Sequence, residues 1–266
     1  MNPDYLDRFG GIGRLYGRAG LQRLHDAHVC VIGIGGVGSW AAEALARSGI
    51  GTITLIDMDD ICVTNTNRQI HALNGTVGQL KTDVVAERLR AINPQCDVRP
   101  VMAFVTTNNL NELIHSGFDY VIDCIDSVKS KAALIAHCKR RKIRIVTTGA
   151  AGGQIDPTQI QIGDLNKTFN DPLARKVRSL LRREYHFSRN PSRNYSVPCV
   201  FSAFVISNLR RNNSFSIIME VSVAARLVAL SVRSSISKSS AVARTWEFGC
   251  RSSPNASTRA PSSGPP

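Results

Sequence analysis

Residues 28–59 read HVCVIGIGGVGSWAAEALARSGIGTITLIDMD, and this stretch decides the fold. An apolar strand leads into a glycine-rich turn, a helical pattern follows, and a second apolar strand ends in an acidic residue. Glycines let the backbone bend sharply, so that amide N–H groups at the start of the helix can meet a phosphate group. The stretch therefore predicts a strand–helix–strand unit that binds a nucleotide.

Strand-like and helical patterns alternate through most of the chain that follows. Such alternation implies right-handed crossovers. We therefore expect an α/β fold of the Rossmann-like, doubly wound type, with a mostly parallel sheet, helices on both faces and ligands at the carboxyl ends of the strands. The expected strands are 29–34, 52–57, 98–105, 119–125, 143–149 and 158–165, and the expected helices are 37–48, 79–93, 108–116, 129–142 and 171–185.

Charge and cysteine content narrow the class of protein. The 266 residues carry a formal net charge of +13, which fits either an acidic partner such as nucleic acid or a solvated basic surface. None of the seven cysteines forms a C-x-x-C pair, so no zinc clip or disulfide framework is expected. The sequence has no signal peptide and no apolar run of the ~18 residues that a membrane span needs. A cytoplasmic location is the expectation.

The glycine turn fits a known phosphate-binding pattern. Gly33, Gly35, Gly36 and Gly38 satisfy G-x-G-x-x-G. An acidic residue is expected about 20 residues later, at the end of the second strand, where it binds a ribose. Asp57 occupies that position. The pattern is shared by NAD and ATP sites, so it leaves both open.

Residues beyond the turn favour ATP. Arg68 and Lys81 follow the second strand, and Asp126 follows the fourth. Each alone would more often be a surface charge or a helix cap. A nicotinamide site does not need this set, whereas attack on the α-phosphorus of ATP needs cations to neutralise the phosphates and a carboxylate to hold Mg²⁺. Together they predict ATP chemistry.

Several stretches resemble one family over residues 7–202. The chain resembles the ATP-dependent adenylating family that includes ubiquitin-activating enzymes and the bacterial adenylyltransferases of sulfur-carrier proteins. Within it, the sequence is most similar to the branch that acts on N6-threonylcarbamoyladenosine in tRNA. The stretches that carry the resemblance are RFGGIGRLYG (8–17), GIGGVGSWAAEALARSGIG (33–51), LIDMDDICVTNTNRQIHAL (55–73), YVIDCIDSV (120–128), KAALIAHC (131–138) and TTGAAGGQIDPTQIQIGDLNKT (147–168).

The resemblance implies a role for each site residue. ATP and Mg²⁺ would be the cofactors, with Asp126 as the metal ligand. Family members are homodimers in which an N-terminal arginine reaches the neighbouring subunit's site, and Arg14 matches it better than Arg8. A cysteine desulfurase or sulfur-acceptor system is an implied partner. The cofactor-binding residues would be Gly33, Gly35, Gly36, Gly38, Asp57, Asp59, Asn65 and Gln69, and the catalytic residues Arg14, Arg68, Lys81 and Asp126.

The implied reaction begins when the free carboxylate of the modified base attacks ATP. A nitrogen of the same base then closes a ring and expels AMP, so that water is lost overall. Three alternatives remain open: activation of a sulfur-carrier protein, nucleotide or RNA binding without catalysis, and NAD-dependent oxidoreduction. The helix 171–185 would hold Arg175, Arg178 and Arg182 on one face, either to grip tRNA phosphates or as a solvated surface.

The composition changes after residue 203. The last 63 residues contain eight lysines or arginines but only two acids, and they end in SSPNASTRAPSSGPP. We expect an adenylating domain at 1–203 and a poorly ordered Ser/Arg-rich tail at 204–266, in which 217–232 is apolar enough for one helix or strand. The break suggests a shifted reading frame or a replaced C-terminus. Nucleotide binding is therefore expected to survive better than tRNA modification.

Overall fold

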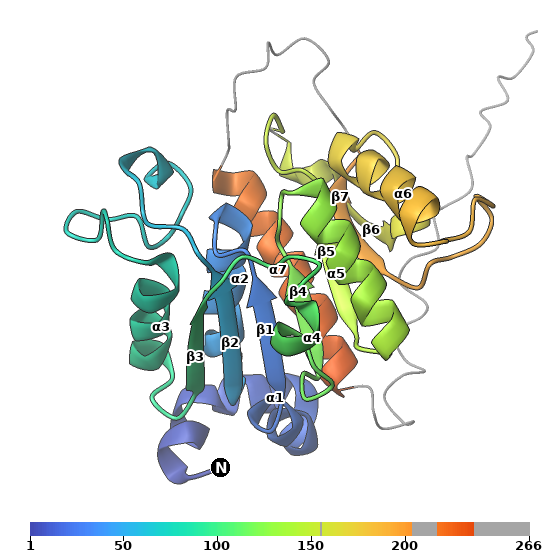
Figure 1. Cartoon of the computed structure of the whole chain (residues 1–266). Helices are drawn as coiled ribbons and strands as arrows, with labels where there is room; N and C mark the ends of the chain where they lie inside the picture. Colours follow the sequence, from blue (N-terminus) through green and yellow to red (C-terminus); the bar gives the residue numbers. More distant parts are fainter. Residues whose placement is uncertain (155, 204–216, 237–266) are drawn as a thin grey trace, which may run out of the picture. The chain divides into compact units, whose positions relative to one another are not determined.

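A computed structural model describes residues 1–154, 156–203 and 217–236, and a seven-stranded sheet forms its centre (Figure 1). Its strands are β1 (His28–Ile32), β2 (Thr52–Asp57), β3 (Asp97–Met102), β4 (Tyr120–Asp123), β5 (Ile145–Thr148), β6 (Ile160–Asp164) and β7 (Pro198–Ser202). They are neighbours in the order β3-β2-β1-β4-β5-β7-β6, and all pairs are parallel except β6 with β7. The expected mostly parallel, doubly wound α/β sheet is confirmed.

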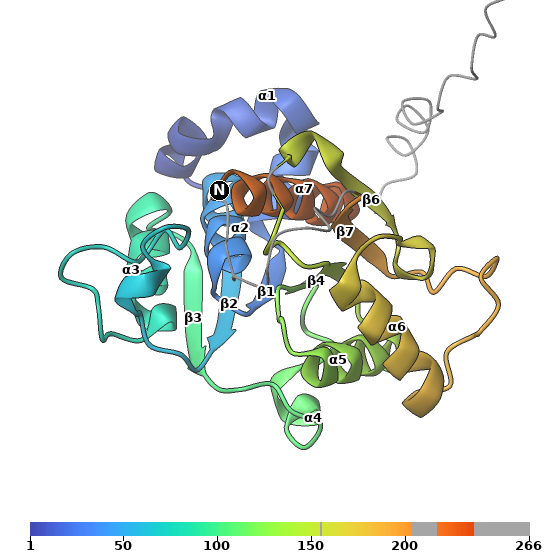
Figure 2. The same ribbon diagram turned by 90° about the horizontal axis from the view of Figure 1, so that it is seen from above.

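Helices cover both faces of the sheet (Figure 2). Helices α2 and α7 lie on one face, and α5 and α6 lie on the other. The helices are α1 (Pro3–His25), α2 (Gly36–Arg47), α3 (Lys81–Ile92), α4 (Leu110–Leu113), α5 (Val128–Arg141), α6 (Pro172–Glu184) and α7 (Ile217–Ile236), with short 3-10 turns at Val63–Asn65, Pro157–Gln159 and Leu165–Lys167.

Strand β1 shows how alternation builds the two cores. Val29 and Val31 pack into the cluster that contains α2 and α7, while Cys30 and Ile32 pack into the cluster under α5 and α6. Successive side chains of a strand point to opposite faces, so an apolar run is needed where both faces are covered. This explains why β1 is apolar without polar alternation.

The strand order reverses at β1, which pairs with β2 on one side and with β4 on the other. Ile32 lies opposite Asp123, so the loops that leave β1 and β4 start side by side. In sheets of this kind the crevice beyond such a switch point holds the ligand. The carboxyl ends of β1, β2 and β4 therefore define where a site is expected.

Some elements differ from the expectations. β7 was not among the expected strands, although it pairs with β5 and carries the edge strand β6. The expected helix at 108–116 is reduced to Leu110–Leu113. Helix α1 begins at Pro3, where the Asn2 side chain accepts a hydrogen bond from the Tyr5 amide, and it kinks at Gly17, whose φ is 75°. The sequence of α1 is too polar for its apolar pattern to define the length of the helix.

Helix α7 packs against the sheet as part of the compact unit, although its residues fall within the expected tail. The helix resolves the open choice between helix and strand for 217–232, and one compact unit spans Met1–Ile236. Val223, Ala224 and Leu227 are buried in the same cluster as α2. The expectation of poor order for the rest of the tail concerns 204–216 and 237–266, which lie outside the described residues. Of the helices that are described, none is long and apolar enough to cross a membrane.

Candidate functional site

In the glycine turn after β1, Gly33 and Gly38 lie too close to neighbouring backbone atoms to carry side chains. Gly33 has φ 85°, and a Cβ there would lie 2.9 Å from the carbonyl oxygen of Cys124 after β4. A Cβ on Gly38 would overlap the carbonyl oxygen of Gly33. Gly35 precedes α2 and offers no side-chain cap to its first turn. The uncapped amides of that turn are donors suited to a phosphate, with the helix dipole favouring negative charge.

Asp57 is held against this turn at the end of β2. Its Oδ2 accepts a 2.5 Å hydrogen bond from the Ile34 amide, and its Oδ1 accepts a 2.9 Å bond from the Asp59 amide. These bonds fix the carboxylate where the second strand meets the phosphate turn. Each oxygen retains a lone pair for a hydroxyl donor, so the geometry fits the ribose-binding position predicted for Asp57.

Arg68 sits on a loop that is braced from several sides. The Asn65 carbonyl accepts bonds from the amides of Arg68 and Gln69, and the buried Asn65 side chain accepts one from the Cys62 amide. The indole of Trp40 in α2 donates a 2.9 Å bond to the carbonyl of Arg68. The loop is therefore tied directly to the helix that follows the phosphate turn.

Gln69 borders the same turn. Its Nε2 would lie 3.9 Å from a Cβ placed on Gly35, and its Oε1 has no partner among the described residues. The side chain is 6% exposed. A buried amide oxygen without a partner costs free energy unless a ligand or water completes it, so Gln69 fits the supporting role predicted for it.

Lys81 is a buried cation at the start of α3. Its Nζ lies 2.8 Å from Asp59 Oδ2, and its amide donates to the Asp59 carbonyl. A positive charge at a helix N-terminus is disfavoured by the helix dipole. The Asp59 carboxylate offsets that cost and holds the ammonium group near the end of β2. The structure thus gives Asp59 a contact to Lys81, whereas the sequence predicted only that it binds the cofactor.

Asp126 lies exposed beyond β4 and has no hydrogen bond or ion pair within the part of the chain that the structure describes. The loop that carries it starts from Asp123, whose Oδ1 accepts a bond from the Ile125 amide. A solvent-facing carboxylate with free oxygens suits a cation that keeps most of its waters. It is the only predicted metal ligand, and no cluster of three ligating side chains occurs among the described residues.

Two residues near the site were not predicted from the sequence. Lys131 is 1% exposed, and its Nζ lies 2.9 Å from Asp123 Oδ2, which also accepts a 2.6 Å bond from Thr147. A single lysine on the apolar face of 131–138 was the available signal. The other is Glu220 of α7, which is 3% exposed and lies beside Gly36 and Arg68. Its signal was one acid within an apolar run.

Arg14 is not brought to the phosphate turn within one chain. It is an exposed residue of α1, which runs past the amino ends of the strands, whereas the turn follows the carboxyl end of β1 (Figure 1). The alternative, Arg8, is also exposed and pairs with Asp4 at 3.1 Å. The role expected for either arginine therefore needs a second subunit.

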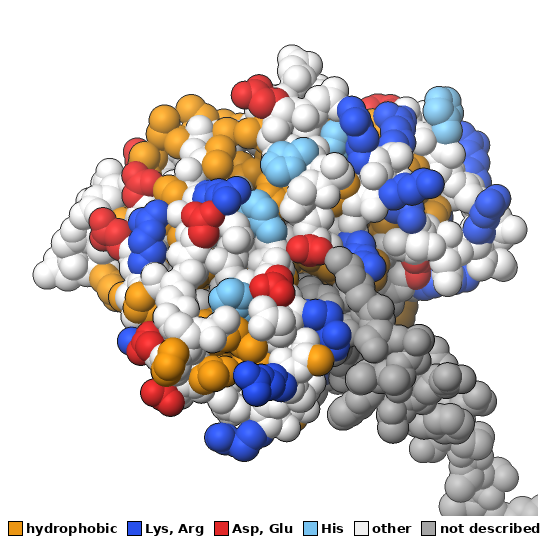
Figure 3. All heavy atoms as spheres, turned by 90° about the horizontal axis from the view of Figure 1, so that it is seen from below, with side chains coloured by type: hydrophobic (Ala, Val, Ile, Leu, Met, Phe, Trp, Pro, Cys, Tyr) orange, Lys and Arg blue, Asp and Glu red, His pale blue; other side chains and the backbone are white. Residues whose placement is uncertain are grey.

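The basic face of α6 is partly used inside the protein. Arg178 bonds to Thr168, and Arg182 donates 2.9 Å and 2.8 Å bonds to Tyr195 and Asn166. These contacts favour a structural role for the two arginines. Arg175 remains exposed on the same helix. Lysine and arginine side chains also gather on the α5–α6 side of the lower face (Figure 3).

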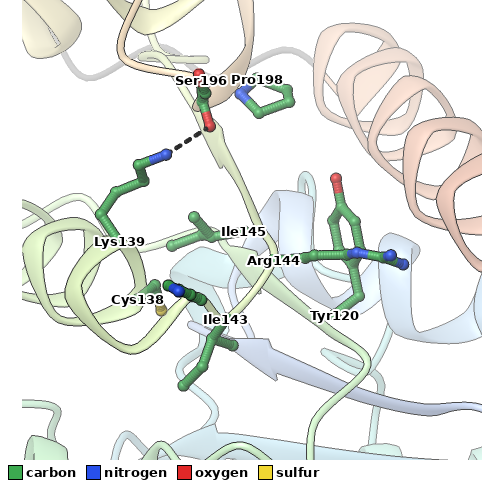
Figure 4. A pocket seen from close by; sticks show the side chains of 9 residues that line it. Tyr120, Cys138, Lys139, Ile143, Arg144, Ile145, Ser196 and Pro198 are labelled. Carbon is green, nitrogen blue, oxygen red and sulfur yellow. Dashed lines mark hydrogen bonds between the residues drawn. The ribbon is translucent and has the colours of Figure 1, made fainter.

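A basic cavity of about 400 Å³ lies at the other end of the sheet. Its lining includes Tyr120, Lys139, Lys142 and Arg144, and Lys139 donates a 3.5 Å bond to the Ser196 carbonyl (Figure 4). Tyr120 and Ile145 begin β4 and β5, so the cavity borders the amino ends of these strands. It is therefore separate from the candidate nucleotide site at the carboxyl ends.

Comparison with known proteins assigns this arrangement to one family. The model of the ThiF family matches residues 11–241. The chain is 63% identical over 202 residues to the tRNA threonylcarbamoyladenosine dehydratase of Escherichia coli, covering 76% of this chain and 75% of the relative. The crystal structure of the E. coli enzyme with ATP is similar with a TM-score of 0.86 and 52% identity, covering 90% of this chain and 97% of that one. The structure of the same enzyme with AMP gives a TM-score of 0.86.

Proposed function

The chain belongs to the ThiF family, and we propose that it catalyses the ATP-dependent dehydration of N6-threonylcarbamoyladenosine in tRNA. The structures of its E. coli relative with ATP and with AMP support a reaction that starts from one nucleotide and ends with the other. The observation that carries the proposal is that the phosphate turn, Asp57, Arg68 and Lys81 all follow the carboxyl ends of β1 and β2. Hydride transfer does not need these cations, whereas adenylation does.

The reaction has two chemical steps. In the first, the carboxylate oxygen of the modified base attacks the α-phosphorus, the bond to the bridging oxygen breaks, and pyrophosphate leaves with that electron pair. In the second, a nitrogen of the same base attacks the activated carbonyl and loses its proton, and AMP leaves with the original carboxylate oxygen. The elements of water are thereby removed. The second step is intramolecular, so correct positioning supplies much of its rate.

The residues of this chain have distinct tasks in the first step. The turn at Gly33–Gly38 would hold the phosphates, and Asp57 would orient the ribose. Arg68 and Lys81 would neutralise charge that develops as pyrophosphate leaves, while Asn65 and Gln69 keep their loop in place. Water is excluded from Lys81 because its side chain is buried, which strengthens its electrostatic effect.

Asp126 fits a magnesium ion bound together with ATP. Mg²⁺ is often held by one or two carboxylates, with phosphate oxygens and water as its remaining ligands. One exposed carboxylate at the end of β4 meets that requirement without a dedicated protein cage. When bound, the ion supplies positive charge to the phosphates. Asp126 would orient it, and the pair Asp123–Lys131 would keep the loop of Asp126 in position.

The proposed assembly is a cytoplasmic homodimer. Because Arg14 lies on α1, away from the phosphate turn of its own chain, it would serve the site of the neighbouring subunit. Partners would be tRNA and, through the family analogy, a cysteine desulfurase or sulfur-acceptor system. Arg175 and the basic cavity around Lys139 are candidate contacts for tRNA phosphates.

The test is AMP release from ATP by the purified protein. We expect release only with tRNA that carries N6-threonylcarbamoyladenosine and only in the presence of Mg²⁺, and we expect Asp126→Ala to lose it. Asp60→Ala is the matched control, because Asp60 is an exposed carboxylate near the site with no assigned role. Release that depends on a sulfur-carrier protein instead of tRNA would replace the proposal with the adenylyltransferase alternative.

A further inference from the structure

Glu220 fills the space that the missing side chain of Gly36 leaves. A Cβ placed on Gly36 would overlap the carboxyl group of Glu220. Gly36 is the first residue of α2 and lies within the Gly33–Gly38 turn that is expected to hold phosphate. The carboxylate of α7 thus reaches the helix N-terminus at a position where no side chain covers the backbone.

Glu220 also contacts a residue assigned to the phosphates. Its Oε1 lies 3.8 Å from Arg68 Nε, and its Oε2 has no hydrogen-bond partner among the described residues. The residue is only 3% exposed. A buried carboxylate with one oxygen unpaired among the described residues is poorly compensated by the ion pair with Arg68 at this distance. The packing of α7 alone would therefore not favour a charged Glu220 at this position.

A carboxylate and a phosphate are stabilised by the same groups at the start of α2. Both are anionic oxygens that are stabilised by a helix N-terminus and by a guanidinium group. The two cannot occupy the same space, and two adjacent anions also repel each other. From this geometry we propose that Glu220 is an internal competitor of the nucleotide phosphates, which must displace it from Gly36 and Arg68 before ATP binds. This inference rests on the proposed use of ATP by the site.

The competition depends on the charge of Glu220. Burial raises the pKa of its carboxyl to about 7, and the Arg68 guanidinium only partly opposes that rise. The charge of Glu220 also adds to the raised pKa of the Cys124 thiol after β4, which burial chiefly causes, so that thiol stays protonated. Below neutral pH the carboxyl is neutral and releases Arg68. Above it the charged form holds the site, so ATP should bind more weakly at pH 8 than at pH 6.

The experiment compares wild type with Glu220→Gln in binding of ATP and of adenosine at pH 6 and pH 8 by calorimetry. Glutamine keeps the size of the side chain and removes its charge. Arg226→Gln is the control, because it changes one charge on an exposed position of the same helix. ATP titrates identically in every comparison, so the difference between proteins isolates Glu220. Adenosine lacks phosphate and reports on the remainder of the site.

We expect Glu220→Gln to bind ATP about tenfold more tightly than wild type at pH 8, with a smaller ratio at pH 6 and no change for adenosine. Equal ATP affinities for the two proteins at pH 8 would overturn the inference and leave the proposed function intact. An equal gain for adenosine would overturn it as well, because α7 would then simply be loosened. Absence of ATP binding in both folded proteins at both pH values would overturn the inference and the proposed function together.

Discussion

Lys81 Nζ lies 2.8 Å from Asp59 Oδ2, so the cation at the start of α3 is held by a carboxylate from the loop after β2. The helix dipole and burial both disfavour a cation at this position. The role proposed for Lys81, which is to bring positive charge to the nucleotide phosphates, accounts for a lysine held there against these costs. The ion pair with Asp59 therefore positions the Lys81 ammonium group near the end of β2.

The first prediction follows from that position. Lys81→Ala should lower the rate of AMP formation by about 10²–10³, because one preorganised positive contact to the leaving phosphates is lost. The measurement is AMP release with modified tRNA at saturating ATP. Arg99→Ala, which removes an exposed cation of the edge strand β3, should leave the rate unchanged. Equal rates for Lys81→Ala and wild type would contradict the role of Lys81.

A second prediction concerns the anchor of the phosphate turn. Asp57→Ala removes the acceptor for the Ile34 amide together with the ribose ligand. We expect ATP affinity to fall by at least about tenfold and the free energy of unfolding to fall by about 1–3 kcal/mol. Calorimetric titration and urea unfolding measure the two effects separately. Asp60→Ala should change neither, and unaltered ATP binding by Asp57→Ala would refute the assignment.

A third prediction tests the buried pair behind the loop of Asp126. Lys131→Met leaves the Asp123 carboxylate buried without its cation, which should cost about 3–5 kcal/mol of unfolding free energy. Addition of Asp123→Asn should recover part of that loss, since the stranded charge is then removed. Lys129→Met, at an exposed position of the same helix, serves as the control. Additive effects of the two substitutions would mean that they do not form a coupled pair.

A fourth prediction concerns stability at acidic pH. His71 is 1% exposed, and burial lowers the pKa of its imidazole to about 4, with Lys81 adding to the effect. Between that value and the ordinary pKa of about 6.5, the unfolded state binds a proton that the folded state does not, so stability falls as the pH drops. The contribution lost over this window is up to about 3 kcal/mol.

Urea unfolding of wild type and His71→Leu at pH 7 and pH 4.5 measures that contribution. Glu220 acts in the opposite direction in part of the window, because its raised pKa stabilises the protein at lower pH. The comparison between the two proteins removes that background. We expect the loss on acidification to be smaller in His71→Leu, whereas equal losses would show that His71 stays neutral in the unfolded chain or charged in the folded one.

Local patterns predicted the parts of the site that neighbouring residues build. The strands β1 and β2, the glycine turn and Asp57 all lie within one strand–helix–strand unit, so apolar runs and glycine spacing were enough. Lys81 follows the second strand, as the sequence indicated, and it is the first residue of α3. The pairing of β7 with β5 was not predicted, because five residues at the end of a long loop carry no periodic signal of their own.

Contacts between distant segments set the limit of prediction. Arg178 and Arg182 share a helix face as expected, but their bonds to Thr168, Tyr195 and Asn166 depend on how the loop before β7 folds back. Glu220 is a single acid in an apolar helix, and only the docking of α7 beside α2 brings it to Gly36. No spacing of residues along the sequence predicts either of these two sets of contacts.

The measurement that tests the central claim most directly is the mass of the modified nucleoside. Wild type and Glu220→Gln are incubated with Mg²⁺, tRNA that carries N6-threonylcarbamoyladenosine and ATP at a concentration that does not saturate wild type, and the tRNA is digested to nucleosides for mass spectrometry. We predict a nucleoside that has lost one water and that appears in step with AMP, faster with Glu220→Gln than with wild type at pH 8. An unchanged nucleoside with both proteins, while both still bind ATP, would contradict the account.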